Sequence, residues 1–225
     1  MKKKEHQPKK KKKPWPTKDA MAQIYEMNLW GGVNKEFYSG EGSHDPDLVD
    51  PYIKAVATFL NSFDEPITVC DLGCGDFNVG KELVKHTKHY TAIDIVPALI
   101  QRNRERFRLK GLEFQCLNIA KDKLPSADCA LVRQVLQHLS NKEVENILAK
   151  LAHFKYVILT EHLPEGEFEP NKDIISGQGT RLKIRSGLDV FSAPFNFKVK
   201  EKNQLASVIL DDGRGIIKTS LYKVF

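Results

Sequence analysis

Short apolar runs alternate along the chain with stretches in which apolar residues recur every three to four positions. The runs predict buried strands at 67–72, 89–95, 112–117, 127–133 and 154–160. The helical patterns between them cover 79–86, 98–107 and 142–152. Strands that alternate with helices in this way predict an α/β domain, doubly wound around a mostly parallel sheet.

Two further strands are predicted near the end of the chain, at 204–210 and 215–224. The segment between them contains Asp-Gly, which favours a hairpin turn. We therefore expect a seven-stranded sheet that ends in a C-terminal antiparallel hairpin. Residues 163–197 show no clean periodicity, and an ordered loop of this length is usually functional. This segment is expected to form a flap that binds a substrate.

The region ahead of the first strand is predicted to contain two helices and a structured loop. Thr17 is suited to cap a helix that runs to Met27, with Ala20, Ile24 and Met27 as its apolar stripe. Residues 47–63 form an amphipathic helix. Residues 29–44 combine four glycines with three aromatic residues, a composition unlike that of a solvated linker. We interpret this loop as the wall or lid of a pocket, or alternatively as a loop packed on the domain edge. The residues expected to reach the ligand are Tyr38, Ser39, Gly40 and Ser43.

The most informative stretch is 67–80, which predicts a strand, a glycine turn and the start of a helix near Asn78. Gly73 and Gly75 allow the backbone to approach a ligand closely. A dinucleotide fingerprint needs a glycine where this chain has Asn78. Asp71 and Asp76 flank the turn, and two carboxylates repel a pyrophosphate. They suit a ligand with an ammonium group and ribose hydroxyls, such as S-adenosylmethionine.

Further polar residues follow the ends of the next predicted strands, where ligands bind in open parallel sheets. Asp94 comes 23 positions after Asp71, the length of one strand–helix unit, and its carboxylate can accept both hydroxyls of a ribose. The alternative for Asp94 is a helix cap. The remaining candidates at these ends are Ile95, Asn118, Ile119, Arg133 and Gln134. Asn118 is placed to accept a hydrogen bond from an adenine amine.

Asp71-Leu-Gly-Cys-Gly75 closely resembles motif I of the class I S-adenosylmethionine-dependent methyltransferases. Asp94, Asn118, the exit of the fourth strand and the final hairpin follow in the order of that family, over about residues 47–225. The resemblance implies a Rossmann-like fold, S-adenosylmethionine as cofactor and methyl transfer as activity. Members often have an acid where this chain has Asn118. Several other stretches, among them Trp30-Gly-Gly32 and 133–140, are similar to a bacterial branch without a firm acceptor.

The resemblance leaves the acceptor open between classes. The chain lacks the Asn/Asp-Pro-Pro-Tyr signature of enzymes that methylate amino groups of nucleic acids, and the paired cysteines of C5-pyrimidine enzymes. A small-molecule acceptor, methylated on oxygen or nitrogen, is the first expectation. An RNA or protein methyltransferase recruited by the N-terminal tail and a non-catalytic cofactor-binding module are the alternatives.

Three titratable residues lie near the expected acceptor side of the sheet: His138, Glu161 and His162. A hydroxyl acceptor must lose a proton, and a histidine suits that task at neutral pH. His138 is the first candidate for a base or an orienting residue, with simple packing at a helix start as its alternative. Arg181 is a candidate to hold an anionic acceptor, or else it forms a surface ion pair.

Composition places the chain among ordinary globular proteins, because 41% of its 225 residues are hydrophobic and 28% are charged. No apolar run approaches the length of a membrane span, and the basic N-terminus lacks the apolar core of a secretory signal. The four cysteines form no C-x-x-C pair, so no metal site is expected. We interpret them as core thiols of a cytoplasmic protein. The oligomeric state is left open.

The net charge of +6 comes from one end of the chain. Residues 1–18 hold nine lysines and one glutamate, a net of +8, which leaves −2 for the remainder. Residues 1–16 are therefore predicted to be a disordered tail, ahead of an N-terminal helix and loop at 17–46 and the main domain at 47–225. The tail is available to nucleic acid, anionic lipid or an acidic protein, or has no specific partner.

Overall fold

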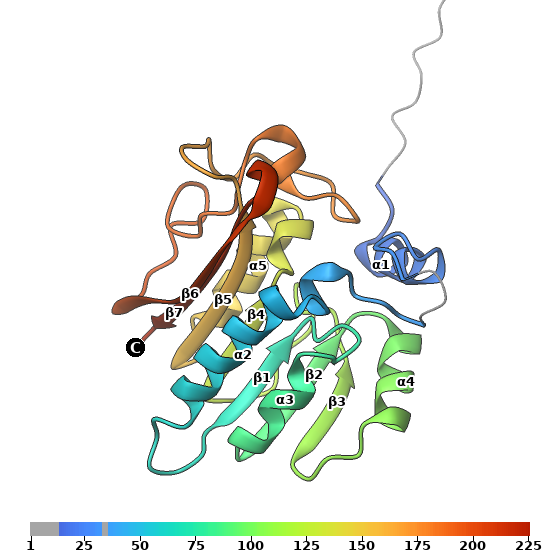
Figure 1. Ribbon diagram of the computed structural model, residues 1–225, viewed down its shortest axis with the longest axis vertical. Coiled ribbons are helices and arrows are strands. Elements are labelled where there is room, and N and C mark those ends of the chain that lie inside the picture. Colours follow the sequence, from blue (N-terminus) through green and yellow to red (C-terminus); the bar gives the residue numbers. More distant parts are fainter. Residues whose placement is uncertain (1–13, 33–35) are drawn as a thin grey trace, which may run out of the picture.

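The computed structural model describes residues 14–32 and 36–225, so most of the lysine-rich tail lies outside it. Its centre is a seven-stranded sheet in the order β3-β2-β1-β4-β5-β7-β6 (Figure 1). The strands are β1 Thr68–Leu72, β2 His89–Asp94, β3 Leu112–Cys116, β4 Cys129–Arg133, β5 Tyr156–Leu163, β6 Glu201–Leu210 and β7 Gly215–Lys223. Strands β1 to β5 pair in parallel, and β7 is antiparallel to both β5 and β6. The predicted Rossmann-like architecture with a closing hairpin is confirmed.

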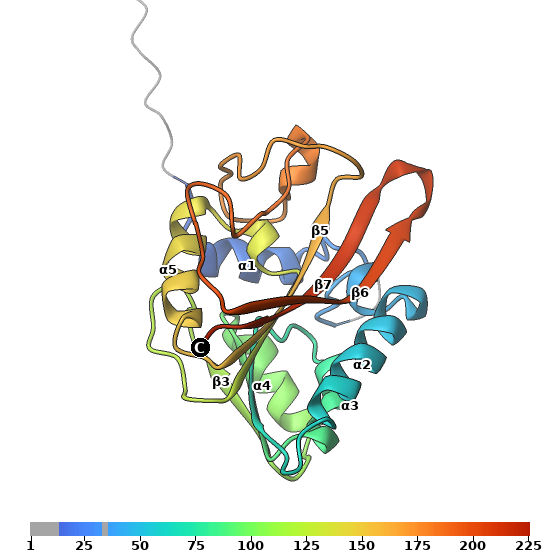
Figure 2. The ribbon, with the colours of Figure 1, turned by 90° about the vertical axis from the view of Figure 1, so that its left-hand side faces the viewer.

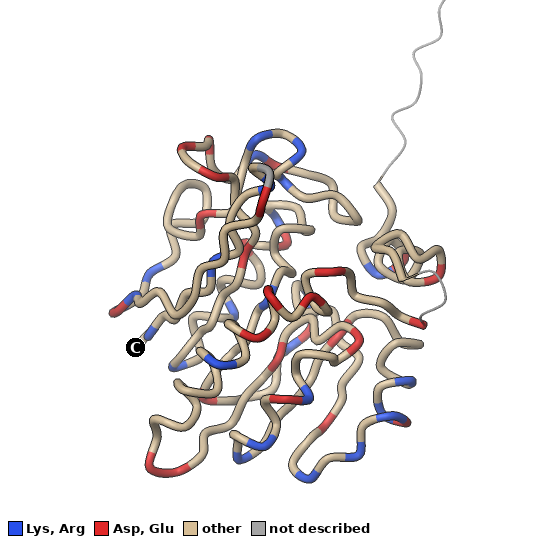
Figure 3. The backbone as a smooth tube through the Cα atoms, viewed as in Figure 1, with Lys and Arg blue, Asp and Glu red and all other residues tan. Residues whose placement is uncertain are grey.

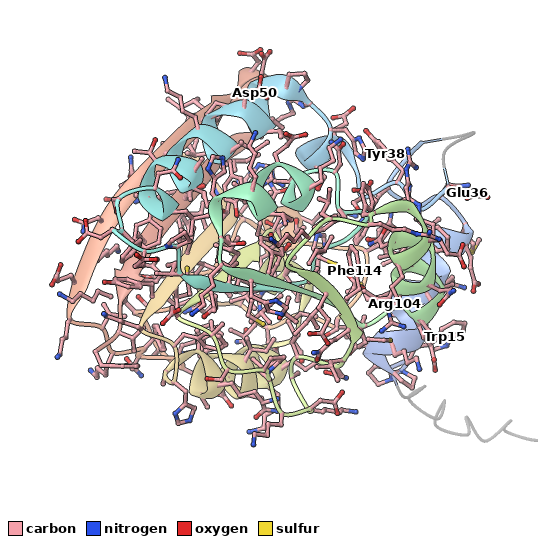
Figure 4. The ribbon with its side chains drawn as sticks, turned by 90° about the horizontal axis from the view of Figure 1, so that it is seen from below. Trp15, Glu36, Tyr38, Asp50, Arg104 and Phe114 are labelled. Carbon is pink, nitrogen blue, oxygen red and sulfur yellow. The ribbon has the colours of Figure 1, made fainter. Side chains whose placement is uncertain are left out.

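Helices cover both faces of the sheet. They are α1 Thr17–Glu26, α2 Pro46–Leu60, α3 Gly80–Leu83, α4 Pro97–Arg106 and α5 Asn141–Leu151. Figure 4 shows α2 and α3 on one side of the strands and α5 on the other. The irregular segment between β5 and β6 lies beyond the carboxyl end of β5 (Figure 2). It contains one short 3-10 turn, Arg181–Ile184.

Alternation along the strands explains the two faces. Val69 and Leu131 pack in one buried cluster with Val56 and Leu60 of α2. Their strand neighbours Cys70, Leu72, Ala130 and Val132 pack in the other cluster, with Ile147 and Leu151 of α5. Successive strand residues point to opposite faces, and here both faces are covered. This is why the central strands read as continuous apolar runs.

The buried face of helix α1 differs from the face that the sequence pattern predicted. The expected stripe was Ala20, Ile24 and Met27, but the buried residues are Met21, Ile24 and Tyr25, and Met27 is 60% exposed. The helix lies beyond the carboxyl ends of the parallel strands (Figure 1), so its inner side is set by what it covers there. Its buried residues belong to the same core cluster as α5, so α1 packs as part of the main domain.

Helix α3 is shorter than predicted, with four residues followed by a 3-10 turn at Val84–His86. Phe77 has a left-handed backbone, φ +65°, and its fully buried ring packs edge-on against Tyr90, Phe107 and Phe114. Because Phe77 turns inward, regular helix begins only at Gly80. The helix start, predicted near Asn78, therefore lies further from the glycine turn.

A group of lysine and arginine residues lies along α4 and the loop after it (Figure 3).

Cys70 and Cys129 are buried, but Cys116 is exposed at the end of the edge strand β3, so the expectation of four core thiols is wrong for Cys116. Among the described residues, none of the helices is long and apolar enough to cross a bilayer.

Candidate active site

A cavity of about 460 Å³ lies at the carboxyl ends of the parallel strands, beneath α1. One part is lined by the glycine turn, Asp94 and Asn118, and another by His138 and His162. This is the edge at which the sequence predicted a ligand. Of the predicted site residues, those that line the cavity are Ser43, Gly73, Gly75, Asp94, Ile95, Asn118, Ile119, Arg133, Gln134, His138 and His162.

The glycine turn is held against β2 and against its neighbours. The N–H groups of Gly73 and Cys74 both donate to the Ile93 carbonyl, at 2.8 Å each. Gly73 and Gly75 have φ of +88° and +55°. A Cβ on Gly73 would lie 2.4 Å from a methyl of Val135, and one on Gly75 would lie 2.5 Å from Ser39 Oγ. Protein neighbours as well as the backbone conformation therefore require glycine at both positions.

Asp94 ends β2 and faces the cavity beside the glycine turn. Its Oδ2 accepts from the Gly75 N–H at 3.1 Å, and its Oδ1 accepts from the Val96 N–H at 3.1 Å. Burial raises the pKa of this carboxyl group, against the lowering effect of the backbone N–H donors. Each carboxylate oxygen has a second lone pair, so Asp94 retains acceptor capacity for hydroxyl groups in the cavity.

Asn118 shapes the loop after β3. Its Oδ1 accepts from the Ala120 N–H at 3.0 Å, and its own N–H donates to Asp122 Oδ2 at 2.7 Å. Together with Ile119 it lines the same part of the cavity as Met21 and Tyr25 of α1. This corner combines an amide with apolar walls, as an aromatic base requires.

Three predicted cofactor residues, Asp71, Asp76 and Asn78, do not line this cavity. Asp71 points toward α2 and accepts from Tyr90 Oη at 2.9 Å, and burial raises its pKa to about 7. Asp76 Oδ2 accepts from the Ser39 N–H at 3.0 Å and lies 2.5 Å from His44 Nε2. Asn78 Nδ2 donates to the Ser43 carbonyl at 2.8 Å.

The loop from 36 to 45 forms a wall of the cavity, anchored by Asp76 and Asn78. Ser39, Gly40 and Ser43 line the cavity, whereas Tyr38 stacks on His44 with ring centroids 4.4 Å apart and does not line it. The aromatic ring of Tyr38 thus stabilises the loop from outside. Predicted residues 33–35 of this loop lie outside the described part of the chain.

Arg133 and Gln134 connect β4 to this wall. Arg133 Nη2 donates to the Gly42 carbonyl at 2.5 Å, and its guanidinium lies 4.9 Å above the Tyr52 ring. Burial lowers the pKa of Arg133. Gln134 has φ +55°, and its N–H donates to the Thr160 carbonyl at 2.7 Å.

His138 and His162 line the cavity from the 3-10 turn Leu136–His138 and from β5. His138 Nδ1 lies 3.2 Å from the Gly179 carbonyl oxygen, and Trp30 packs on its ring with centroids 5.2 Å apart. Burial lowers the pKa of His138 to about 4. His162 Nε2 lies 2.7 Å from the Arg214 carbonyl oxygen, and burial lowers the pKa of His162 as well.

Glu161 and Arg181, also predicted as site residues, are buried outside the cavity. Arg181 directs its five N–H donors to the carbonyl oxygens of Leu136, Gln137, Leu139 and Lys172 and to Asn141 Oδ1. The prediction that Arg181 binds an anionic acceptor is therefore wrong, because no donor is left for one. The two oxygens of Glu161 have no hydrogen-bond partner among the described residues, and burial raises its pKa to about 8.

Sequence reasoning missed two groups of lining residues. Thr17, Met21 and Tyr25 of α1 close one side, and Leu210, Arg214 and Ile217 of the terminal hairpin border the side of His162. The i, i+4 spacing of Met21 and Tyr25 was a usable signal for one helix face. The hairpin residues carry no local signal, because pairing of β7 with β5 brings them to this edge.

Comparisons with known proteins agree with this geometry. A family model described as a methyltransferase domain matches residues 70–154. NodS, an N-methyltransferase from Bradyrhizobium japonicum WM9 solved with S-adenosyl-L-homocysteine, superposes with a TM-score of 0.66 at 13% identity, over 91% of this chain and 98% of that chain. The magnesium protoporphyrin IX methyltransferase ChlM from Synechocystis PCC 6803, solved with S-adenosylmethionine, gives 0.58 at 14% identity, over 95% and 100%.

The methyltransferase domain of a bacterial Hen1 protein gives a TM-score of 0.55 at 20% identity, over 77% of this chain and 98% of that chain. At such identities the structural likeness establishes the shared fold. No curated protein matches the chain by sequence. The matched segment holds the glycine turn, Asp94, Asn118 and His138, which is most of the cavity's floor. Residues 70–154 therefore match a methyltransferase domain, and the chain shares the fold of methyltransferases solved with S-adenosylmethionine or S-adenosyl-L-homocysteine.

Proposed function

We propose that this protein transfers the methyl group of S-adenosylmethionine to an oxygen or nitrogen of a small molecule bound beside His138 and His162. The observation that carries the proposal is the continuity of the cavity. It joins the glycine turn and Asp94 to the two histidines within about 460 Å³. An acceptor of modest size fits a cavity covered by α1 and the 36–45 loop.

The residues fit the cofactor at three points. Asp94 would hold the ribose hydroxyls, because it faces the cavity with free acceptor capacity. Asn118 and Ile119, opposite Met21, would surround the adenine, and the turn at Gly73–Gly75 would border the methionine end. When bound, the cofactor supplies an electrophilic methyl group. The protein's part is to align the acceptor and exclude water, which is worth roughly 7–11 kcal/mol of barrier in favourable cases.

The chain's four free cysteines suit a reducing compartment, and we propose a cytoplasmic location on that ground. His138 and His162 are the proposed catalytic or orienting residues. Glu161 can act only through other groups, because it does not line the cavity.

The lysine-rich segment supports a second candidate function, in which the acceptor is an RNA or a protein. Residues 1–18 carry a net charge of +8, and polyanions are attracted to such a segment. Methyl transfer from labelled cofactor into size-fractionated cell extract, with and without RNase and protease, separates the two functions. Label in small molecules supports the first, and nuclease- or protease-sensitive label supports the second.

Calorimetry with S-adenosyl-L-homocysteine tests cofactor binding directly. We expect the wild-type chain to bind and Asp94→Ala to bind at least about 10-fold more weakly, because hydrogen bonds to a charged group are lost. Asp50→Ala is the matched control, since Asp50 is exposed on α2. Absence of binding to the wild-type chain, or equal affinity of Asp94→Ala, would overturn the proposal.

A further inference from the structure

A chain of three hydrogen bonds centred on Gln137 crosses the histidine end of the cavity. Gln137 Oε1 lies 2.9 Å from the backbone nitrogen of His162, and Gln137 Nε2 lies 3.3 Å from His138 Nε2. His138 Nδ1 in turn lies 3.2 Å from the Gly179 carbonyl oxygen. Gln137 is 7% exposed, so water competes little with these contacts. The chain links β5, the turn after β4 and the irregular segment after β5.

The direction of each bond follows from the chemistry of its partners. A backbone N–H can only donate, so it is the amide oxygen of Gln137 that faces His162. The amide NH₂ group therefore faces His138, and because NH₂ only donates, His138 Nε2 must carry a lone pair. A carbonyl oxygen only accepts, so His138 Nδ1 must carry the hydrogen that goes to Gly179. His138 is thus held neutral, in the Nδ1–H tautomer.

A second proton on His138 would place Nε2–H against the amide N–H of Gln137. This repulsion agrees with a pKa of His138 lowered by burial to about 4. The charged groups that face this region are Arg181, which also lowers the pKa of His138, and Glu161, whose charge acts on Arg181. With its Nε2 already accepting a hydrogen bond, His138 is a poor proton acceptor.

His162 has the opposite arrangement. Its Nε2 lies 2.7 Å from the Arg214 carbonyl oxygen, so Nε2 carries the hydrogen and Nδ1 carries the lone pair. Among the described residues nothing hydrogen-bonds to Nδ1 of His162, and the residue lines the cavity. The charge of Arg214, which also lines the cavity, lowers the pKa of His162. One basic ring nitrogen is therefore left for the acceptor, and it belongs to His162.

We infer that Gln137 is a positioning residue that commits His138 to the Nδ1–H tautomer, and that His162 Nδ1 receives the proton of a hydroxyl acceptor. The inference rests on the proposed function. In the step, the acceptor oxygen takes up the methyl group as its O–H bond breaks. The carbon–sulfur electron pair stays on sulfur, and the proton with its positive charge moves to His162 Nδ1. The resulting imidazolium still donates from Nε2 to the Arg214 carbonyl.

Nitrogen-15 NMR of the histidine rings in the full chain tests the assignment without an acceptor. At pH 7 we expect Nδ1–H for His138 and Nε2–H for His162, with signals assigned through His138→Gln and His162→Gln. Gln137→Glu replaces the donating NH₂ by an acceptor, so His138 should take up a proton on Nε2 while it keeps Nδ1–H, and its pKa should rise by more than one unit. Gln204→Glu, on the exposed strand β6, is the matched control and should leave both rings unchanged.

Two results would overturn the inference: an Nε2–H tautomer for His138 in the wild-type chain, or a His138 ring that ignores Gln137→Glu. A catalytic arm uses labelled methyl transfer into cell extract. His162→Gln should lower incorporation by about 100-fold, the usual contribution of a general base, without weakening S-adenosyl-L-homocysteine binding. Unchanged incorporation contradicts the role of His162. If the ring tautomers are as expected but the wild-type chain binds no S-adenosyl-L-homocysteine, the proposed function fails and the hydrogen-bond assignment stands.

Discussion

Glu161 is a carboxyl group in the protein interior with neither oxygen hydrogen-bonded among the described residues. Taking a carboxylate out of water is costly, so such a group prefers its protonated form. Burial accordingly raises the pKa of Glu161 to about 8, although the charge of Arg181 and the nearby backbone N–H groups of Gln137 and Leu136 oppose the rise. In the unfolded chain the carboxyl group of Glu161 has its ordinary pKa of about 4.3. Folding therefore favours the protonated form between these two values.

The consequence is a pH-dependent loss of stability that Glu161→Gln should remove. Because the folded-state pKa is raised, the stability is fully present below about pH 4.3 and is lost as the pH rises to about 8. We expect the variant to gain on the wild type across this window, by roughly 3–4 kcal/mol between pH 5 and pH 8. Urea unfolding at pH 5 and pH 8 measures the difference. An equal difference at both pH values contradicts the raised pKa.

A second prediction at the residue scale concerns Arg181. Its planar guanidinium satisfies carbonyl groups on two segments, 136–141 and Lys172, in a fixed fork. Lysine has three donors on a flexible stem, so Arg181→Lys leaves buried carbonyls unsatisfied and should cost about 2–4 kcal/mol of unfolding free energy. Arg185→Lys, at an exposed position on the same turn, should cost almost nothing. Denaturant midpoints of the two variants decide the point.

At the site, the sequence predicts which residues gather at the strand ends better than it predicts where their side chains point. Asp71 and Asp94 both end strands beside the glycine turn, but Asp71 shares the α2-facing side of β1 with Val69 and accepts from Tyr90. Asp94 lies at the end of β2 and faces the cavity. Strand alternation assigns a side only once it is known which helix covers which face. That information comes from tertiary packing and is absent from the local pattern.

At the scale of elements, α1 covers the cavity and is held through Ser39. Ser39 Oγ lies 3.0 Å from Tyr25 Oη of α1 and accepts from the Asp76 N–H at 2.8 Å. Ser39 Oγ thus joins α1, the 36–45 loop and the glycine turn. At the N-terminal end of α1, Thr17 Oγ1 donates to Glu143 Oε1 at 2.6 Å. Helix α1 lies at the edge of the core and near the N-terminal end of the described chain, so its opening is expected to be local.

Ser39→Ala should loosen α1 without unfolding the sheet. We expect faster hydrogen exchange in 17–26 and an S-adenosyl-L-homocysteine dissociation rate raised by about 5- to 20-fold, the effect of losing one to two buried hydrogen bonds. Ser62→Ala removes a local, exposed hydrogen bond to the Phe59 carbonyl and serves as the control. Exchange that rises throughout the sheet in Ser39→Ala would assign Ser39 to global stability instead.

The strands and the longer helices were predictable because burial repeats along them, whereas α3 was not. Its apolar pattern over 79–86 fits a helix, but Phe77 inserts into an aromatic cluster built by β2, β3 and α4. Phe77 takes up a left-handed backbone to reach it. The start of α3 is decided by residues that are distant in the sequence, and the pattern within the segment does not contain them.

At the scale of the whole molecule, charge and fold are separated along the chain. The described domain holds a slight excess of acids, and one group of its basic residues lies along α4 and the loop after it (Figure 3). Eight of the lysines lie at positions 2–13, outside the described residues. The described residues that line the cavity begin at Thr17. Cofactor binding and polyanion binding should therefore respond independently to changes in the tail.

Deletion of residues 1–13 tests this separation, with a chain that keeps its length but has glutamine at the eight lysine positions as the matched control. Both variants should unfold within about 0.5 kcal/mol of the wild type and bind S-adenosyl-L-homocysteine equally well, because the described residues that line the cavity begin at Thr17. Both should lose affinity for single-stranded RNA at low salt, together with most of the salt dependence, since counterion release scales with the number of phosphates neutralised. A weakened cofactor affinity in either variant would mean that the lysines take part in the site. If both variants retain their affinity for RNA, the RNA-binding surface lies on the domain and not on the tail. The basic residues of α4 would then be the first candidates for that surface.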